Sequence, residues 1–229
     1  MALFSRTPDE DDTIVSLVAS GLRRDISFGV LPPDARLKLT DLRSRYGGSN
    51  HSIREALRIL STEGLVEAEA QRGFRVASAT EADLADILRL RVEIEGTALD
   101  WSLAHGDVTW EGSVIAAHHA LGRAEEAVAA APDDLTALEW DEALRTFHAA
   151  LAAASGSPRI IALQKQFYDQ SRRFTLAALR EARLDFAARK ARQAALLQSV
   201  LDRDAPAARA ALTDNILGDL APHRTGPVP

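Results

Sequence analysis

The stretch YGGSNHSIREALRILSTEGLV, residues 46–66, decides how the first part of this 229-residue chain folds. Gly47-Gly48 predicts a tight turn, and the apolar spacing that follows predicts a helix over 50–63. Ser49 is the expected N-cap of this helix, and the S-x-x-E box at 52–55 is the alternative. The stretch therefore predicts a sharp turn that leads directly into a helix.

The predicted helix has two different faces. At about 100° per residue, its apolar side chains gather on one face; they are Ile53, Ala56, Leu57 and Leu60. The opposite face offers Asn50, His51, Arg54 and Arg58. A helix in the major groove of DNA presents its first turns to base edges, where Asn suits adenine and Arg suits guanine. The alternative is a solvated polar face on an ordinary helix, but the preceding turn and the local charge favour DNA.

The elements expected around this helix complete a winged helix-turn-helix. In chain order they are a helix over 12–28, a strand over 35–39, a short helix carrying Leu42 and Tyr46, the turn, the helix 50–63, and a hairpin formed by LVEAEA and GFRVA. The hairpin is the expected wing.

The rest of the chain is rich in alanine and predicts a mainly α protein with a second, all-helical domain. Six or seven helices are expected; six of them run over about 81–105, 109–131, 134–154, 157–180, 182–202 and 204–219. Glycine or proline marks the breaks between them. We therefore expect a DNA-binding domain over 1–79 and a helical bundle over 80–229.

Charge and composition narrow the function classes. The net charge is −6, but the segment from Arg36 to Arg58 contains six basic residues and only two acidic ones. Such a patch engages phosphates locally, because salt screens each contact beyond about 8–10 Å. The chain has no cysteine, which excludes disulfides, thiolate metal sites and a cysteine nucleophile. It has no signal-peptide core and no apolar run near the ~18 residues of a membrane span, so we expect a cytosolic protein.

The run LPPDARLKLTDLRSRYGGSNHSIREALRILSTEGLVEAEAQRGFRVA resembles the DNA-binding domain of GntR-type bacterial transcription regulators. The resemblance implies a homodimer that binds a short palindromic operator, more often as a repressor. Position 50 is usually Arg and position 52 often Pro in that family, whereas this chain has Asn50 and Ser52. The DNA contacts that the residues and the resemblance predict are Lys38, Thr40, Arg43, Arg45, Ser49, Asn50, His51, Arg54, Arg58, Arg72 and Gly73. Of these, the basic residues before the turn are assigned to phosphates.

The runs ADLADILRLRVEIEGTALDWSLAHGD and FHAALAAASGSPRI resemble the all-helical FCD effector domain found in the FadR branch of these regulators. AHGDVTWEGSVIAAHHAL and QFYDQSRRF are similar to the CsiR-like members, which respond to small carboxylic acids. The resemblance implies a helical domain that binds an effector and dimerises.

Many FCD domains hold a divalent metal with one Asp or His and three His. The matching positions here are Leu144, His148, Gln193 and Asn215. Leucine offers no ligand, and amide carbonyls are poor ligands for zinc-class ions, so we expect no tightly held metal and no other cofactor. His148, Gln193 and Asn215 are instead expected to hydrogen-bond the effector directly.

Two arginines are candidates to hold the carboxylate of an effector. They are Arg91 and Arg173. For Arg91 the alternative, an ion pair with Glu95 one turn later, is favoured.

An enzyme and a ligand-independent regulator are the two alternative functions. The sequence has no G-x-S-x-G elbow, no phosphate-binding P-loop and no H-E-x-x-H pair, and neighbouring carboxylates such as Glu125-Glu126 are interpreted as solvated surface groups, so an enzyme is not expected. A ligand-independent regulator with a purely structural bundle is the alternative to an effector-responsive one. The sequence predicts a DNA-binding regulator, with duplex DNA and a small effector as its partners.

Overall fold

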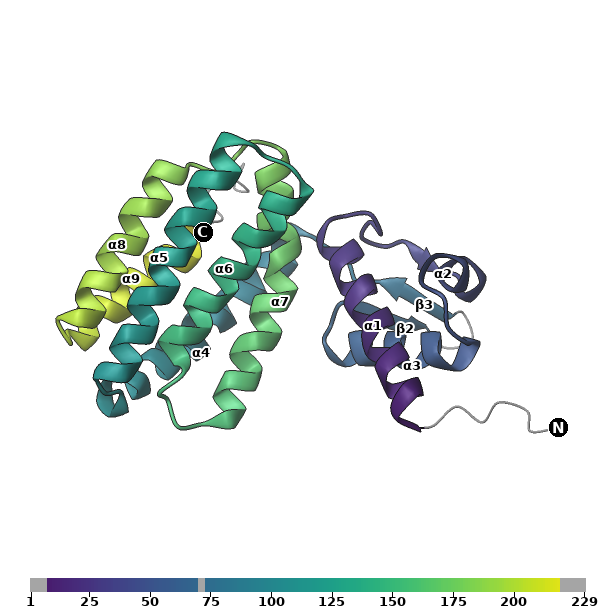
Figure 1. The fold of residues 1–229 in the computed structure, drawn as a ribbon, viewed down its shortest axis with the longest axis horizontal. Coiled ribbons are helices and arrows are strands. Elements are labelled where there is room, and N and C mark those ends of the chain that lie inside the picture. The colour runs from purple at the N-terminus through teal and green to yellow at the C-terminus, as the bar shows by residue number, and fades with distance from the viewer. Residues whose placement is uncertain (1–7, 70–72, 219–229) are drawn as a thin grey trace. The chain divides into compact units, whose positions relative to one another are not determined.

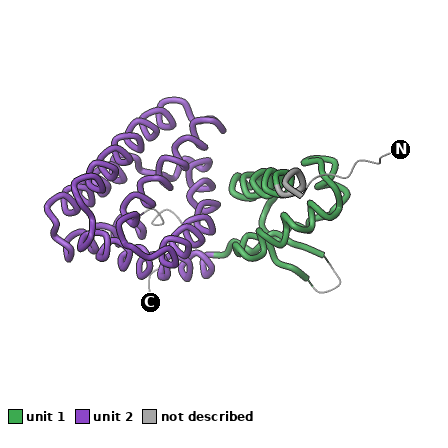
Figure 2. Tube along the Cα trace, turned by 60° about the horizontal axis from the view of Figure 1, so that its bottom comes forward, with its two compact units in different colours: residues 1–80 green, residues 81–229 purple. Residues whose placement is uncertain are grey.

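The structure is a computed structural model that describes residues 8–69 and 73–218. It is mainly helical, and its contacts divide the chain into two compact units, residues 1–80 and 81–229 (Figure 2). The predicted fold class is confirmed.

Unit 1 is a winged helix-turn-helix (Figure 1). Its elements are α1 (Pro8–Ser27), β1 (Arg36–Leu37), α2 (Leu39–Tyr46), α3 (Asn50–Thr62), β2 (Val66–Glu69) and β3 (Gly73–Val76). The strands form one antiparallel sheet in the order β1-β3-β2, with Leu37 opposite Phe74 and Val66 opposite Val76. β1 is shorter than predicted because Leu39 already begins α2.

The core of unit 1 forms where α3 packs on α1 and on β2. The apolar face predicted for α3 is fully buried there, as Ile53, Ala56, Leu57 and Leu60 each have 0% exposure. The turn before α3 requires glycine: Gly48 has φ +81°, and a Cβ at this position would lie 3.3 Å from Ile14 Cγ2. The turn therefore brings α2 and α3 together against α1.

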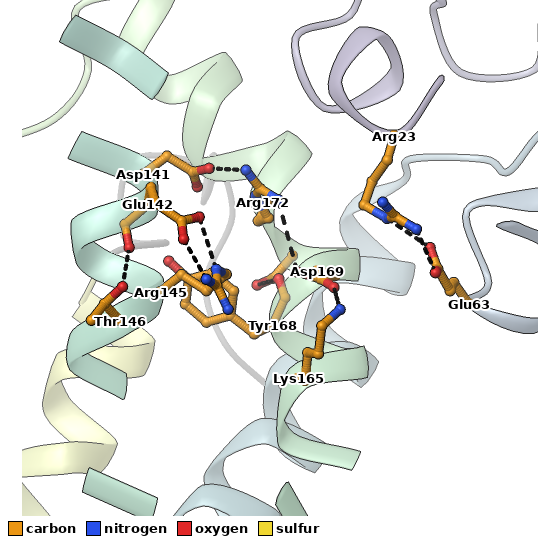
Figure 3. Close-up of polar contacts among 11 residues, drawn as sticks. Arg23, Glu63, Asp141, Glu142, Arg145, Thr146, Lys165, Tyr168, Asp169 and Arg172 are labelled. Carbon is orange, nitrogen blue, oxygen red and sulfur yellow. Dashed lines mark hydrogen bonds and ion pairs between the residues drawn. The ribbon is translucent and has the colours of Figure 1, made fainter. Parts of the chain in front are cut away.

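Two polar ties join α1 to the helices beside it. Arg23 donates to both oxygens of Glu63, the residue that caps the C-terminal end of α3, at 2.9 Å from Nε and 2.6 Å from Nη2 (Figure 3). Asp25, which is 3% exposed, accepts hydrogen bonds from Arg45 Nε at 2.8 Å and from the Tyr46 hydroxyl at 2.7 Å, both at the end of α2. These ties hold α2 and α3 in register on α1.

Unit 2 is a bundle of helices (Figure 1). In the part of the chain that the structure describes they are α4 (Glu81–His105), α5 (Val108–Ala130), α6 (Asp134–Ala152), α7 (Pro158–Arg180), α8 (Phe186–Leu201) and α9 (Ala205–Gly218). Side-chain oxygens of Asp107, Asp133, Ser157 and Asp185 cap the N-termini of α5 to α8. These caps satisfy backbone N–H groups that have no partner within the helix.

The predicted start of the fifth bundle helix is wrong by four residues. The helix-forming sequence after position 182 favours helix, but Ala182 adopts φ +52° and its N–H donates to the Leu179 carbonyl at 3.0 Å, which closes α7. Asp185 then accepts a hydrogen bond from Ala188 N at 3.0 Å and starts α8.

α4 packs against α6, α7 and α9, while α5 packs against α6 and α8. The large side chains of Trp140, Phe147 and Leu99 are completely buried at these contacts. No helix among the described residues is long and apolar enough to cross a membrane.

Candidate functional site

The exposed face of α3 carries the side chains predicted to read DNA. Asn50, His51 and Arg54 are exposed, on the opposite side from the buried apolar face. Ser49 is the N-cap: its hydroxyl accepts a hydrogen bond from Ser52 N at 3.0 Å and contacts the Ser52 hydroxyl at 2.9 Å. Ser52 is thereby buried, and the alternative box at 52–55 is not used. The hydroxyl of Ser49 holds the helix end, and the three exposed side chains begin immediately after it.

The six cations between Arg36 and Arg58 fall into two groups. Within the described ranges no ion pair engages Arg36, Lys38, Arg43 or Arg54, and all four are exposed. The other two candidates are engaged: Arg45 Nη2 lies 2.7 Å from Asp25 Oδ2, and Arg58 Nη1 lies 3.0 Å from Glu55 Oε2. The first group is therefore available to phosphates without breaking an internal contact.

The remaining predicted DNA contacts lie on α2 and the wing. Thr40 is exposed and its hydroxyl donates to Asp41 Oδ1 at 3.1 Å. Gly73 is exposed at the start of β3. Arg72 lies outside the described residues.

Asp25 is anionic at neutral pH despite its burial. Burial raises the pKa of Asp25, but the hydrogen bonds from Tyr46, Arg24 and Arg45 outweigh it and hold that pKa below its usual value. Burial and the bond to Asp25 raise the pKa of the Tyr46 hydroxyl. The exposed guanidinium of Arg45 is therefore already bonded to a buried carboxylate of unit 1.

In unit 2 the predicted candidates Arg91 and His148 meet at a shared carboxylate. Arg91 Nε donates to Glu95 Oε1 at 2.6 Å, and Arg91 Nη1 donates to the Ser171 hydroxyl at 3.0 Å. Glu95 Oε2 lies 2.6 Å from His148 Nδ1, and the guanidinium of Arg91 stacks on Tyr168 at 4.8 Å. These five side chains are all buried, and we call them the Glu95 cluster.

The charges of the Glu95 cluster stabilise its carboxylate. Burial raises the pKa of Glu95, but the neighbouring Arg91 and His148 outweigh it and lower that pKa to about 2. The ion pair of Arg91 with Glu95, which the sequence favours, is present. Because a carboxylate only accepts hydrogen bonds, His148 carries its proton on Nδ1 and, when neutral, offers the lone pair of Nε2.

A second polar cluster joins α6 to α7 (Figure 3). Arg172 donates to Asp141, and its Nη1 lies 3.8 Å from Asp169 Oδ1. Lys165 Nζ donates to Asp169 Oδ2 at 2.6 Å. Burial raises the pKa of Asp141 against the opposing charge of Arg172. This cluster pairs its acids with its own cations and ties two helices together.

A third group, the Glu125 cluster, contains Glu125, Trp140, Arg189 and Gln193, from α5, α6 and α8. Gln193 Nε2 donates to Glu125 Oε1 at 2.9 Å, and Arg189 Nε lies 3.4 Å from the same oxygen. The guanidinium of Arg189 stacks on Trp140 at 5.0 Å. Glu125 is 4% exposed, so its interpretation as a solvated surface group was wrong.

The structure brings some predicted effector residues together and leaves others apart. Arg91 and His148 share Glu95, whereas Gln193 belongs to the Glu125 cluster. Tyr168 lies within electrostatic range of charged residues from all three clusters. Burial and the charge of Asp141 raise the pKa of its hydroxyl well above its usual value, and the positive charges of Arg91, Arg172 and Arg189 oppose this rise. Asn215 is buried on α9, and its Oδ1 has no hydrogen-bond partner among the described residues. Arg173 is buried and stacks on Phe174 at 5.0 Å.

The residues at the four metal positions do not fit a zinc-class ion. Leu144 is buried and has no donor atom, and His148 is the single imidazole of the set. Gln193 and Asn215 supply only neutral amides, and a divalent ion prefers several anionic or imidazole ligands. No group of three or more His, Cys, Asp or Glu side chains that could hold a metal ion occurs in the described ranges. The absence of a metal remains a prediction.

Sequence reasoning missed the Glu125 cluster. The sequence of α8 contains a pattern that could have indicated it. Gln193, Leu196 and Val200 follow Arg189 by four, seven and eleven residues, so all four lie on one buried helix face. An arginine on an apolar stripe indicates a buried charge that requires a partner. The partner, Glu125, lies 64 residues away in the chain, so no local pattern identifies it.

Comparisons with known proteins agree with this architecture. Residues 15–76 match the family described as "Bacterial regulatory proteins, gntR family", and residues 86–217 match the FCD domain. The chain is 34% identical over 174 residues to the uncharacterized HTH-type transcriptional regulator BphR of Paraburkholderia xenovorans (strain LB400), covering 75% of this chain and 71% of that protein. It is 34% identical over 159 residues to the HTH-type transcriptional repressor GlaR of Escherichia coli (strain K12), covering 69% and 71%.

Two solved structures share the fold. E. coli McbR/YncC has a TM-score of 0.73 at 22% identity, covering 91% of this chain and 95% of that chain. A GntR transcriptional regulator from Rhodococcus sp. RHA1 has a TM-score of 0.72 at 24% identity, covering 94% and 100%. At these identities the likeness concerns the arrangement of the elements.

Proposed function

This chain belongs to the GntR family of bacterial regulatory proteins and carries an FCD domain, and we propose that it represses transcription until a small acid binds in its bundle. It is a DNA-binding transcriptional regulator, a class of protein without enzymatic activity. The relative GlaR is named a repressor, which supports this direction of control. The site of action is the cytoplasm, where a bacterial operator lies.

The observation that carries the proposal is the division of α3 into a buried face and an exposed one. Asn50, His51 and Arg54 project from the first turns of the helix, where a recognition helix contacts base edges. None of the three supports the apolar core, so all three are free to form bidentate or single hydrogen bonds with bases. Arg36, Lys38 and Arg43 are assigned to phosphates, which fix the orientation of the reader without reading sequence.

We assign smaller roles to the two engaged cations. Arg45 and Arg58 each donate to a carboxylate of unit 1, so a phosphate would compete with that partner. Ser49 contributes through its backbone and its cap, because its hydroxyl is occupied. Thr40 and Gly73 are exposed and are assigned to backbone contacts.

A homodimer is supported by an apolar stripe on the outside of α4. Leu90 and Trp101 are 36% and 43% exposed, and with the half-buried Ile94 they lie on one helix face at spacings of four and seven residues. Large apolar side chains that recur on one face of a helix mark a protein contact. A second copy of the chain is the partner that a palindromic operator requires.

The effector is a small carboxylic acid held inside unit 2. His148, Gln193 and Asn215 are each 2% exposed and offer hydrogen bonds to it. Arg91 is committed to Glu95 and Ser171, so it positions the Glu95 cluster rather than the ligand. Arg189 is a further candidate anchor for the carboxylate, because it lies one turn from Gln193 on α8 and faces the same oxygen of Glu125. Arg173 is the second candidate.

The experiment that tests the proposal is a selection of duplex DNA from a random library by the full-length protein. We expect enrichment of a palindrome whose half-sites are about one helical turn apart, because two reader helices must enter successive major grooves. The selected duplex is then titrated in the presence of small carboxylic acids, one of which should weaken binding. Recovery of no common sequence would contradict DNA recognition, and a duplex insensitive to every acid would favour a ligand-independent regulator.

A further inference from the structure

The exposed face of α3 carries one acidic side chain among its cations. Glu55 is the single acidic residue in the sequence of this helix. Its Oε2 accepts a hydrogen bond from Arg58 Nη1 at 3.0 Å. The Glu55 side chain is 40% exposed and the Arg58 side chain 68%, so both members of the pair lie at the surface. At about 100° per residue, Arg58 lies only about 40° around the helix from Arg54, on the face predicted to contact bases.

This pair differs from that of Arg45, the other engaged cation of the segment. Arg45 is bonded to Asp25, whose side chain is 4% exposed, so the acid of that pair cannot contact DNA. Glu55 instead belongs to the surface that would meet a duplex, where every phosphate carries a negative charge. An acid in that place weakens the attraction of the helix for DNA of any sequence. A helix that bound only phosphates would therefore bind better without Glu55.

The stability of α3 does not account for this acid. An exposed pair three residues apart stabilises a helix only slightly, because water screens the charges and both side chains lose freedom. α3 is already fixed by the Ser49 cap, by the bond of Glu63 with Arg23, and by an apolar face with 0% exposure. The position of Glu55 beside the predicted base contacts points instead to recognition.

The pair retains donors and an acceptor for DNA. Arg58 has five N–H groups and donates one to Glu55, so a parallel pair of N–H groups remains for the O6 and N7 atoms of guanine. Glu55 Oε1 takes no part in that bond, and the base donor that suits a glutamate is the amino group of cytosine. Arg58 also lies about 6 Å along the helix axis from Arg54, close to two base-pair steps of about 3.4 Å, so it faces a base pair of its own.

We propose that Arg58 and Glu55 read one G·C base pair together, with Arg58 donating to the guanine and Glu55 accepting from the cytosine of the same pair. This inference rests on the proposed function, because it assumes that α3 enters the major groove. An A·T pair presents the adenine amino donor to Arg58 and the thymine O4 acceptor to Glu55, so both contacts are unfavourable. Glu55 thus lowers binding to all DNA and lowers it least where the G·C pair is present, which makes it a specificity-determining residue.

The test compares the duplexes that full-length wild type, Glu55→Ala and Arg58→Ala select from a random library. Wild type should fix a G·C pair at one position of each half-site through this pair of residues. We expect both variants to lose the preference at that same position by about tenfold or more and to keep the rest of the selected sequence. Fluorescence anisotropy then gives the ratio of affinities for two duplexes that differ only there, so a change in protein stability cancels.

A second measurement separates recognition from support of the helix. Without the carboxylate, the charge of Arg58 is free to act on phosphates, so Glu55→Ala should bind a duplex of random sequence roughly 3- to 10-fold more tightly, with a steeper salt dependence. An acid that only supported the helix would change both affinities by the same factor and leave the preference intact. The double variant should lose no more preference than Arg58→Ala alone, because the two side chains act as a unit.

Glu142→Ala is the matched control. Glu142 lies on α6 in unit 2, pairs with Arg145 three residues later, and has a side chain that is 52% exposed. The substitution therefore makes the same change of net charge and removes the same kind of pair away from α3. It should leave the base preference and the affinity for random-sequence DNA unchanged.

The outcomes separate the inference from the proposed function. An unchanged preference in Glu55→Ala overturns the inference and leaves a DNA-binding regulator in which Glu55 reads no base. Losses at different positions in Glu55→Ala and Arg58→Ala also overturn it, because the two residues then do not share a base pair. Failure of the wild type to select any common sequence overturns both the inference and the proposed function.

Discussion

The carboxylate of Glu95 accepts a hydrogen bond from the imidazole of His148, with 2.6 Å between Oε2 and Nδ1. The bond joins α4 to α6 in the interior of unit 2, where both residues are almost completely buried. A metal-binding histidine is commonly oriented by such a carboxylate. Here the other positions matching the family's metal ligands hold two amides and a leucine, so under the proposed function His148 bonds to the effector rather than to a metal.

This pair predicts a specific sensitivity to acid. The pKa of Glu95 is lowered from its usual value of 4.5 to about 2, so its contribution to stability is complete above pH 4.5 and is lost as the pH falls towards 2. Glu95→Gln should lose on the order of 3 kcal/mol of unfolding free energy at pH 7. Between pH 4.5 and 2 the variant should lose less stability than the wild type. Urea titrations at several pH values measure how the unfolding free energy of the wild type and the variant depends on pH, with the exposed Glu93→Gln as control. The same pH dependence in wild type and Glu95→Gln would exclude this role for Glu95.

Arg54 should be the most sensitive single position for operator binding. Arg54→Ala removes an exposed side chain that has no ion pair within the described ranges, so the fold is unaffected while a base or phosphate contact disappears. We expect binding to the selected duplex to weaken roughly 10- to 100-fold, which corresponds to ~1–3 kcal/mol. Arg89→Ala, an equal change of charge on unit 2, is the control for fluorescence anisotropy titrations. Unchanged affinity in Arg54→Ala would exclude this residue from the interface.

Asp25 should matter for the stability of unit 1 rather than for DNA contact. Asp25→Ala leaves the Tyr46 hydroxyl and the Arg45 guanidinium without their common acceptor. We expect a loss on the order of 2–3 kcal/mol of unfolding free energy for this unit. The exposed Asp41→Ala should cost less than about 1 kcal/mol, the usual contribution of an acid in the first turn of a helix. Equal melting temperatures of the two variants would show that the Asp25 tie does not stabilise the fold.

Metal removal should leave the protein unchanged. Leu144, His148, Gln193 and Asn215 give a neutral, incomplete ligand set, so neither a chelator nor added zinc is expected to shift the melting temperature by more than about 1 °C. Elemental analysis of protein purified without chelator provides the second reading. Zinc or nickel at one equivalent per chain would contradict the expectation. A stabilisation by zinc that His148→Ala abolishes would do the same.

The sequence predicted most of the architecture because its signals are local. Proline and glycine mark the ends of the bundle helices, and the apolar spacing of α3 identifies its buried face before any contact is known. The ion pair of Arg91 with Glu95 was equally accessible, since its members are one helical turn apart. These features depend on residues within a few positions of one another.

The partners of the buried charges were not predictable in this way. Arg45 is tied to Asp25 across 20 positions, and Arg189 to Glu125 across 64. Both pairs form only because helices that are distant in the chain pack side by side. The pattern of charges along the sequence does not indicate which helices pack together. The candidate effector residues His148 and Gln193 were therefore found from the sequence, while Arg189, one helical turn from Gln193, was missed.

The reader helix is fastened by residues other than those that face outward. Ser49 holds its beginning, the Arg23–Glu63 tie holds its end, and the aliphatic side fixes its rotation. Under the proposed function, a substitution at position 50, 51 or 54 should therefore change the preferred operator sequence with little effect on the stability of the fold. If the assignment holds, one or two point changes on this face are enough for a related chain to recognise new target genes, with the rest of the scaffold untouched.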